Sequence, residues 1–318
     1  MPPKPRTSPK RRSARVHASQ SRLRDPDRAA SYLYSVAFNL ARSRWRRQAS
    51  LERALLRLGR NDDIGQDVSA ISADRDKGLL SLDGGRLAFA KPFAGAWDLY
   101  TLSRDGTDQL RVTHDAAQDA MPAWSPDATM IAFARGEPAQ SDLYMVAADG
   151  SSLDQLTDLD GWENAPTSSP DGTRIAFIRG DDDVNGWGHS GELWVINRNG
   201  TGLSLLRAQD TTNPAWSPDG TRIAFDNITG DGHLGMLDLA TGAVTDLGEG
   251  FFPRWSLDGT RLVLGVLDPA GGSNIYTMAA DGTNRIQLTD DPAFDTAPQW
   301  SPDGATILYG SRPADAGE

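Results

Sequence analysis

The chain has 318 residues, 38% of them hydrophobic, and a formal net charge of −11 at pH 7. It contains no cysteine, which excludes a disulfide framework and a thiolate metal site. No stretch approaches the roughly 18 to 20 apolar residues of a membrane-spanning helix, so we expect no membrane span. Residues 1–60 hold 16 Lys and Arg against 3 acidic residues, a charge of +13, so the remaining 258 residues carry −24. The sequence therefore joins two parts of opposite electrostatic character.

Residues 1–24 are rich in Lys, Arg, Pro and Ser and hold almost nothing apolar, a composition that predicts a disordered basic tail. No apolar run of roughly seven or more residues follows promptly, so the segment lacks the pattern of a secretory signal. Three interpretations stay open: a solvated tail, a start codon assigned too far upstream, and an arm that contacts nucleic acid.

A short basic helical extension is expected over residues 25–59. Asp25 suits the N-cap of a helix and Pro26 its first position, and apolar residues then recur at the spacing of one helix face: Leu33, Val36, Ala37 and Leu40. Ser50 can cap a second helix over residues 51–58, stopped by Gly59. Residues 60–78 are polar and predict a linker, with room for one strand over residues 67–71.

Residues 32–47, YLYSVAFNLARSRWRR, resemble the end of region 2 of extracytoplasmic-function sigma factors. The residues that match that pattern are Tyr32, Leu33, Ala37, Asn39, Leu40, Ala41, Arg46 and Arg47. In that family this helix contributes to promoter recognition and melting, so the resemblance implies a DNA-binding surface made of Asn39, Arg42, Arg44, Arg46 and Arg47. The polymerase-binding helices and the C-terminal helix-turn-helix of the family have no counterpart here. The alternatives are therefore a remnant helix, or a basic helix that packs on the acidic part of the chain.

One motif recurs from residue 79 onward, and its fullest copy is PAWSPDGTRIAF at residues 214–225. The Asp at its turn returns in steps of 44, 44, 48, 39 and 45 residues, at Asp83, Asp127, Asp171, Asp219, Asp258 and Asp303. A period in the forties that is built of short strands is typical of a β-propeller blade. In the turn itself, Pro218 presets φ, Asp219 can bond back to the backbone, and Gly220 can adopt the positive φ of a tight hairpin.

A second half-repeat follows each motif about ten residues later, with an alternating apolar run, a Gly-containing turn and a last strand. Each full repeat then supplies four strands. We therefore predict an all-β fold: a six-bladed β-propeller of four-stranded antiparallel blades over residues 79–318. The sixth blade has only two strands before the sequence ends, so it is either completed by the segment before Leu79 or left short. The Trp residues at one repeat position are expected to pack between blades: Trp124, Trp216, Trp255 and Trp300.

The repeat P-x-W-S-P-D-G-x-x-I-A-F followed by L-Y-x-x-x-x-D-G resembles the TolB-type, WD-like propeller repeat. That resemblance implies a non-catalytic protein-binding module. The same repeat also precedes the hydrolase domain of prolyl-oligopeptidase-type peptidases, so an accessory propeller of a hydrolase is an alternative. No G-x-S-x-G nucleophile motif occurs, and the histidines lie in separate segments, so we expect no enzyme activity, no cofactor and no metal.

The loops that lead into the inner strands of a propeller gather around one mouth of its central channel. There we expect a partner-binding surface of exposed aromatic and acidic side chains suited to a protein of basic character: Asp119, Trp162, Glu163, Asn164, Asn213, Phe251, Phe252, Arg254, Phe294 and Asp295. We expect a monomer with a protein partner, and a DNA-associated transcription regulator is the main alternative. The sigma-like segment favours the cytoplasm, and a misplaced start would instead favour a periplasmic or other extracytoplasmic location.

Overall fold

The structure is a computed structural model that describes residues 56–60, 67–71, 81–83, 86–93, 96–103, 108–137, 140–180, 191–227, 232–268, 272–290, 292–301 and 304–312. The chain divides into two compact units, and every described residue belongs to the one made of Leu51–Ile228 and Gly232–Glu318. The basic tail and the predicted sigma-like helix lie outside the described residues. Within the described residues all regular elements are β-strands.

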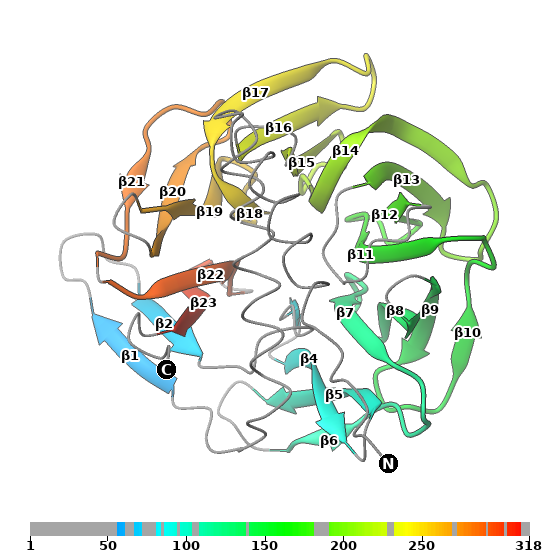
Figure 1. Ribbon diagram of the computed structural model, residues 1–318. Helices are drawn as coiled ribbons and strands as arrows, with labels where there is room; N and C mark the ends of the chain where they lie inside the picture. Colours follow the sequence, from blue (N-terminus) through cyan, green and yellow to red (C-terminus); the bar gives the residue numbers. More distant parts are fainter. Residues whose placement is uncertain are drawn as a thin grey trace, which may run out of the picture. The chain divides into compact units, whose positions relative to one another are not determined.

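The strands recur in units in which each strand is antiparallel to the next (Figure 1). The first unit is β3 (Ser81–Asp83), β4 (Arg86–Phe93), β5 (Ala96–Ser103) and β6 (Leu110–Arg111). The second is β7 (Asp119–Trp124), β8 (Met130–Glu137), β9 (Gln140–Ala147) and β10 (Leu153–Gln155). The third begins with β11 (Trp162–Ser168), β12 (Arg174–Gly180) and β13 (Gly191–Asn197).

One long strand, β14 (Ser204–Trp216), serves two units. Its first half pairs with β13, for example Leu205 with Trp194, and its second half pairs with β15, for example Ala215 with Ala224. The unit that it opens continues with β15 (Arg222–Asn227), β16 (His233–Asp238) and β17 (Val244–Glu249). The next unit is β18 (Phe251–Trp255), β19 (Arg261–Leu267), β20 (Ser273–Ala279) and β21 (Ile286–Gln287).

The last unit combines strands from both ends of the described chain. It holds β22 (Phe294–Trp300) and β23 (Thr306–Arg312), together with β2 (Asp67–Ile71) and β1 (Leu56–Arg60). β2 pairs with β23 in parallel, and β1 pairs with β2 in antiparallel orientation. Of the two alternatives for the last repeat, this pairing corresponds to the one in which the segment before Leu79 adds the missing strands. The expected antiparallel order fails at β2. No hairpin joins β2 to β23, so their connection does not impose the antiparallel direction that a short hairpin would impose.

Strand β1 also corrects one expectation, because it occupies residues that the second predicted helix was to cover. Over residues 56–60 the apolar Leu56 and Leu58 alternate with polar residues and Gly59, which is the period of a strand. The pairing with β2 satisfies the backbone of β1, and such tertiary pairing overrides local helix propensity.

The first strands of the units, called the inner strands below, contact one another in chain order: β3, β7, β11, the second half of β14, β18 and β22. β22 in turn contacts β3, so the series closes on itself (Figure 1). Sheets whose inner strands close in a ring form a β-propeller. The described part of the chain therefore has the all-β, propeller-like fold that its repeats predict.

The turn after each inner strand has the geometry that its sequence predicts. Gly220 has a φ of 69° and donates its N–H to Ser217 O at 2.9 Å. Oδ1 of Asp219 accepts bonds from Ser217 Oγ and from the N–H and hydroxyl of Thr221, and these bonds lower the pKa of Asp219 to about 2. In the second unit Ala128 takes the glycine position with a φ of 55°, which is strained for a residue that has a Cβ.

A bulge bends each inner strand at the residue before its proline. That residue has positive φ in five units, namely Met121, Ala165, Asn213, Phe252 and Ala297. Each lies where the register of its strand pair shifts. Bulges re-aim side chains and increase local twist, so the same bend recurs in every one of these strands.

Tryptophans join consecutive units, as expected for Trp216 and Trp255. Trp216 Nε1 donates to Thr167 O of the preceding inner strand at 3.2 Å, and Trp255 Nε1 donates to Ala215 O at 3.1 Å. A guanidinium from the preceding unit, that of Arg174 or Arg222, lies 4.9 Å from the respective ring centroid. These indoles are buried, so they contribute apolar packing and a hydrogen bond to the joint between units.

Candidate functional site

Most of the side chains expected to form an exposed surface at the channel mouth are buried. Asp119, Glu163 and Asp295 are 0% exposed. Trp162, Asn164, Asn213 and Phe251 are also buried, whereas Phe252, Arg254 and Phe294 are partly exposed. The expectation of an exposed aromatic and acidic rim is therefore wrong for most of these residues, and their role in partner binding stays a prediction.

The aromatic residues of this set pack into glycine-lined positions. A Cβ added at Gly180 would lie 2.4 Å from Trp162 Cζ2, and one added at Gly265 would lie 2.4 Å from Phe251 Cε2. Phe252 packs edge-on against Phe251, with 5.6 Å between ring centroids. Trp162 and Phe251 therefore belong to the packed interior of the unit.

The buried acids are held by side-chain bonds, within one unit for Asp119 and between two units for Glu163. Arg135 donates to both carboxylate oxygens of Asp119, at 2.7 and 2.8 Å. Thr157 Oγ1 accepts from Leu143 N at 2.8 Å and donates to Glu163 Oε2 at 3.0 Å. Burial raises the pKa of Asp119 and raises that of Glu163 to about 8. Neither carboxyl group lines the cavity described next, so their bonding indicates a structural role.

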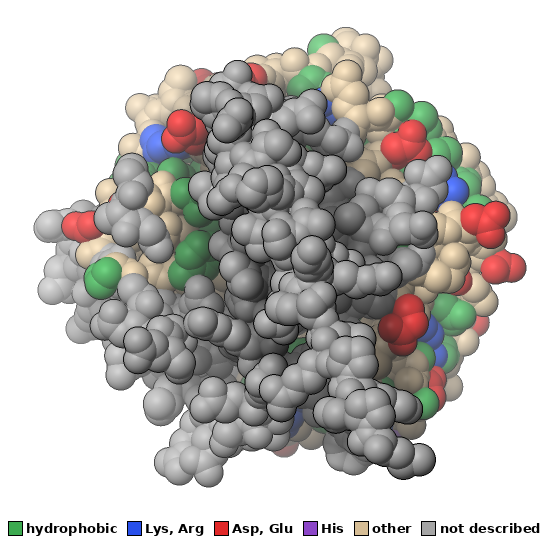
Figure 2. Space-filling view, in the orientation of Figure 1, with side chains coloured by type: hydrophobic (Ala, Val, Ile, Leu, Met, Phe, Trp, Pro, Cys, Tyr) green, Lys and Arg blue, Asp and Glu red, His purple; other side chains and the backbone are tan. Residues whose placement is uncertain are grey.

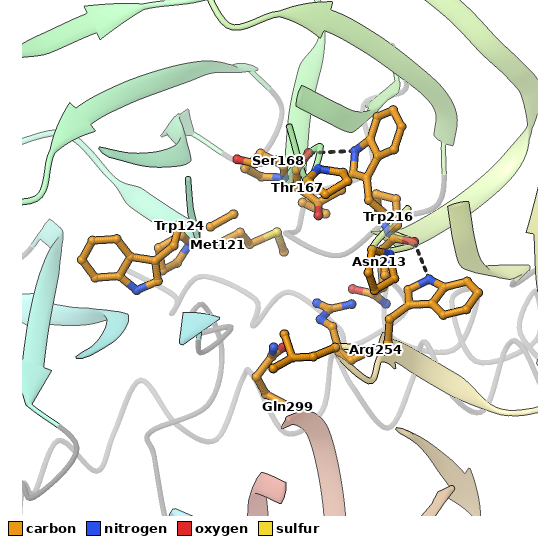
Figure 3. A pocket seen from close by; sticks show the side chains of 18 of the residues that line it. Met121, Trp124, Thr167, Ser168, Asn213, Trp216, Arg254 and Gln299 are labelled. Carbon is orange, nitrogen blue, oxygen red and sulfur yellow. Dashed lines mark hydrogen bonds between the residues drawn. The ribbon is translucent and has the colours of Figure 1, made fainter. Parts of the chain in front are cut away.

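A cavity of about 300 Å³, the central pocket, lies between the bent segments of the inner strands (Figure 3). Its walls come from β7, β11, β14, β18 and the turns that follow them, with one residue of β22. Prolines, tryptophans and Met121 make much of the lining apolar. Its polar side chains are those of Thr167, Ser168, Asn213, Arg254, Ser256 and Gln299.

Arg254 stands out in this pocket because its repeat position otherwise carries uncharged residues: Ala123, Thr167, Ala215 and Gln299. Its side chain extends into the space between the inner strands, between Asn213 and Gln299 (Figure 3). Arg254 Nη1 donates to Pro253 O at 2.8 Å, and no ion pair between described residues includes Arg254. Desolvation lowers the pKa of Arg254, against the attraction of Asp226.

Asp226 is the second unusual residue, because its position in the second strand of other units holds Ala134, Ile178, Gly265 and Gly310, as the strand registers show. Its Oδ2 accepts from Asn213 Nδ2 at 2.7 Å and from Phe252 N at 3.0 Å. Its buried Oδ1 has no hydrogen-bond partner among the described residues. Burial raises the pKa of Asp226 to about 7.

Asn213, Asp226 and Arg254 form what we call the polar cluster. Each departs from its repeat position, and the three meet at the joint between the units opened by β14 and β18. Positions where a chain breaks its own pattern without a packing gain mark functional or strained sites. The polar cluster can offer an entering ligand a cation and amide groups. The described residues contain no group of three or more His, Cys, Asp or Glu that could hold a metal ion.

Comparison with known proteins identifies the family. The family model described as the TolB beta propeller domain matches residues 77–191 and 192–315. The chain belongs to the TolB β-propeller family. The sigma-factor resemblance gains no support, since these matches begin at residue 77 and Asn39, Arg42, Arg44, Arg46 and Arg47 lie outside the described residues.

Solved structures share the fold of this TolB-type propeller at low identity. TolB from Acinetobacter baumannii superposes with a TM-score of 0.60 and 22% identity over 69% of this chain and 56% of that one. A gluconolactonase from Xanthomonas campestris superposes with a TM-score of 0.60 and 14% identity over 81% of this chain and 92% of that one. An uncharacterized peptidase from Bacillus subtilis, YuxL, is 42% identical over 57 residues, which are 18% of this chain and 8% of that protein. The fold is thus shared with a protein named as an enzyme, so the fold alone does not assign a function.

Asp226 is the residue of this TolB-type propeller that sequence reasoning missed. Aligning the strand after each turn would have exposed it, because a carboxyl group replaces an apolar or small residue after the run RIAF. Asn213 and Arg254 were named from the sequence, but as part of an exposed rim. The structure places both on the wall of the central pocket. Among the described residues no helix is long and apolar enough to cross a membrane.

Proposed function

We propose that this chain is a six-bladed, non-enzymatic propeller whose central pocket binds a segment of a partner protein. The observation that carries this proposal is Arg254, a cation without an ion-pair partner among the described residues, in a cavity lined by both apolar and polar side chains. Buried arginines and aromatic residues that line pockets are the usual anchors of protein interfaces. The closed order of the inner strands supports the blade number, with β1 and β2 completing the last blade.

Electrostatics favours a partner segment that is basic overall. Residues 61–318 carry a net charge of −24, and acidic side chains recur around the described edge of the face shown in Figure 2. Such a field attracts basic segments and raises their association rate.

The test is a comparison of proteins captured from the native host by tagged full-length chains. Wild type, Arg254→Ala and Arg198→Ala are compared. Alanine occupies the position of Arg254 in two other units, so this variant should fold. Arg198 is a partly exposed arginine that does not line the pocket and pairs with Asp127 at 3.4 Å, which makes it a matched control. We expect a protein that wild type and Arg198→Ala retain and Arg254→Ala loses. Equal recovery by all three chains would refute the proposal.

A DNA-associated regulator is the second candidate, favoured by the charge of +13 in residues 1–60. Binding through several phosphates weakens steeply with salt. Fluorescence anisotropy of labelled DNA with the full chain, and with Arg42, Arg44, Arg46 and Arg47 replaced by Gln, tests this role. Salt-sensitive binding that the replacement abolishes would support it. A cytoplasmic location is likewise a proposal, which cell fractionation tests.

A further inference from the structure

The wall of the central pocket holds a charge that the described protein does not neutralise at close range. Arg254 offers five N–H donors, and among the described residues its guanidinium donates one hydrogen bond, from Nη1 to Pro253 O. Desolvation in the pocket disfavours the charged form of Arg254, and a partly desolvated cation is stabilised when an anion pairs and hydrogen-bonds with it. An anion that enters the pocket therefore gains more from Arg254 than it would from an exposed arginine.

Asp226 does not act as the counter-ion of Arg254. Its Oδ2 accepts hydrogen bonds from Asn213 Nδ2 and Phe252 N, and it forms no ion pair with the guanidinium of Arg254. Since burial raises the pKa of Asp226 to about 7, this carboxyl group is substantially protonated at neutral pH. At pH 7 the net charge of Arg254 and Asp226 together is then about +0.5, and it approaches +1 as the pH falls.

The remaining donors of the pocket favour a planar, two-oxygen ligand group. A guanidinium binds a carboxylate through two parallel N–H···O bonds. Gln299 lies beside Arg254 on the pocket wall (Figure 3), and its amide can donate a further bond. Met121 and the pocket tryptophans supply apolar surface for the carbon atoms that carry the carboxylate.

We propose that the polar cluster binds a carboxylate, presented by an Asp or Glu side chain of the partner segment, with Arg254 as its direct ligand and Asp226 as a residue that tunes the affinity with pH. This inference rests on the proposed function and names the chemistry that the pocket recognises. The acidic exterior selects basic flanks, and Arg254 on the pocket wall selects the single acid between them.

The affinity of the pocket for a carboxylate should depend on pH in a defined direction. Among the residues that the structure describes, Arg254 is the charged group that acts on Asp226. The other groups facing this carboxyl group are neutral: Asn213 and Thr212 from β14, Phe252 from β18 and Leu234 from β16. Above about pH 7 Asp226 becomes anionic and repels the ligand carboxylate, so affinity falls as the pH rises. In Asp226→Asn this fall should disappear.

The experiment titrates the full-length chain with two end-blocked tripeptides, Ala-Glu-Ala and Ala-Gln-Ala, and with acetate. The indole N–H signals of Trp124, Trp216 and Trp255, which line the pocket, report occupancy by NMR. We expect saturable shifts with the Glu peptide at pH 6, with weaker binding of the Gln peptide and of acetate. Arg254→Gln, which places the residue of the equivalent position 299 at this site, should weaken Glu-peptide binding roughly ten- to hundred-fold.

The outcomes separate the two proposals. Equal binding of the Glu and Gln peptides, no effect of Arg254→Gln in a variant with unchanged thermal unfolding, or no saturable shift would overturn the carboxylate site. Acetate that binds as tightly as the Glu peptide would overturn the assignment to a protein segment. Loss of the captured partner in Arg254→Ala together with no Glu-peptide binding would leave the proposed function standing and reject only this inference.

Discussion

At the scale of single residues, the polar cluster places two ionisable groups where the repeats otherwise have small, apolar or uncharged side chains. Asp226 loses solvation, keeps one oxygen without a hydrogen-bond partner among the described residues, and gains only distant attraction from Arg254. Such groups lower the stability of the fold. Their retention fits a site in which binding is favoured at the expense of stability.

Replacing Asp226 by Asn should stabilise the protein, and more strongly at high pH. The native pKa of Asp226, about 7, lies above the unfolded value, so the native state holds the proton more tightly. The stability of the wild type therefore falls as the pH rises from about 4 through 7. In Asp226→Asn this loss is absent, so the gain in free energy of unfolding should be roughly 2 kcal/mol or more larger at pH 8 than at pH 5.

Urea unfolding of both proteins at the two pH values measures this difference. The amide oxygen of Asn can still accept the bonds from Asn213 and Phe252, so the variant keeps these contacts. The same gain at pH 5 and pH 8 would show that Asp226 is already ionised at pH 5 in the native state.

At the scale of elements, the inner strands β7, β11, β14, β18 and β22 owe their shape to two local features that recur in these five units. The bulge before the proline bends the strand toward the pocket wall, and the turn after the tryptophan reverses the chain. The turn needs a residue with positive φ, which glycine supplies at positions 172, 220, 259 and 304. Ala128 adopts the same conformation and donates the same turn bond, to Ser125 O at 2.9 Å.

Ala128→Gly should therefore stabilise the protein and Gly220→Ala should destabilise it, each by about 1 kcal/mol. The Cβ of an alanine at position 220 would also lie 3.3 Å from Pro170 Cγ, which adds to the cost. Paired urea titrations give both values. A destabilising Ala128→Gly would mean that the flexibility of glycine in the unfolded chain outweighs the backbone strain in the turn.

At the scale of the whole described unit, the sequence period predicts the sheet system well, because a blade is built from contacts between residues that are close in sequence. The regular spacing of the turn aspartates predicts where the inner strands lie. The repeated Trp position predicts the contacts between units at Trp216 and Trp255. What the period does not reveal is how residues of different units meet. In the sequence Glu163 resembles an exposed acidic residue of a loop. In the structure Thr157 and Arg179 lie beside its carboxyl group, and these contacts account for its burial.

The same limit applies to β1 and to the polar cluster. The strand at Leu56–Arg60 exists through its pairing with β2, which local helix propensity does not reveal. Asn213, Asp226 and Arg254 come from three different strands, and the bulged inner strands bring them together at the pocket. Comparison of the repeats with one another would flag each residue as unusual, but their meeting point depends on the closed ring.

The central claim, that a protein partner enters the central pocket, is tested most directly by site-specific photo-crosslinking in the native host. A benzoylphenylalanine is placed at Gln299, on the pocket wall, and in a second chain at Leu267, which is 51% exposed and outside the pocket. The account predicts one defined protein adduct from position 299, lost when Arg254→Ala is added, and no such adduct from position 267. Adducts that form equally from both positions, or none from position 299, would contradict it.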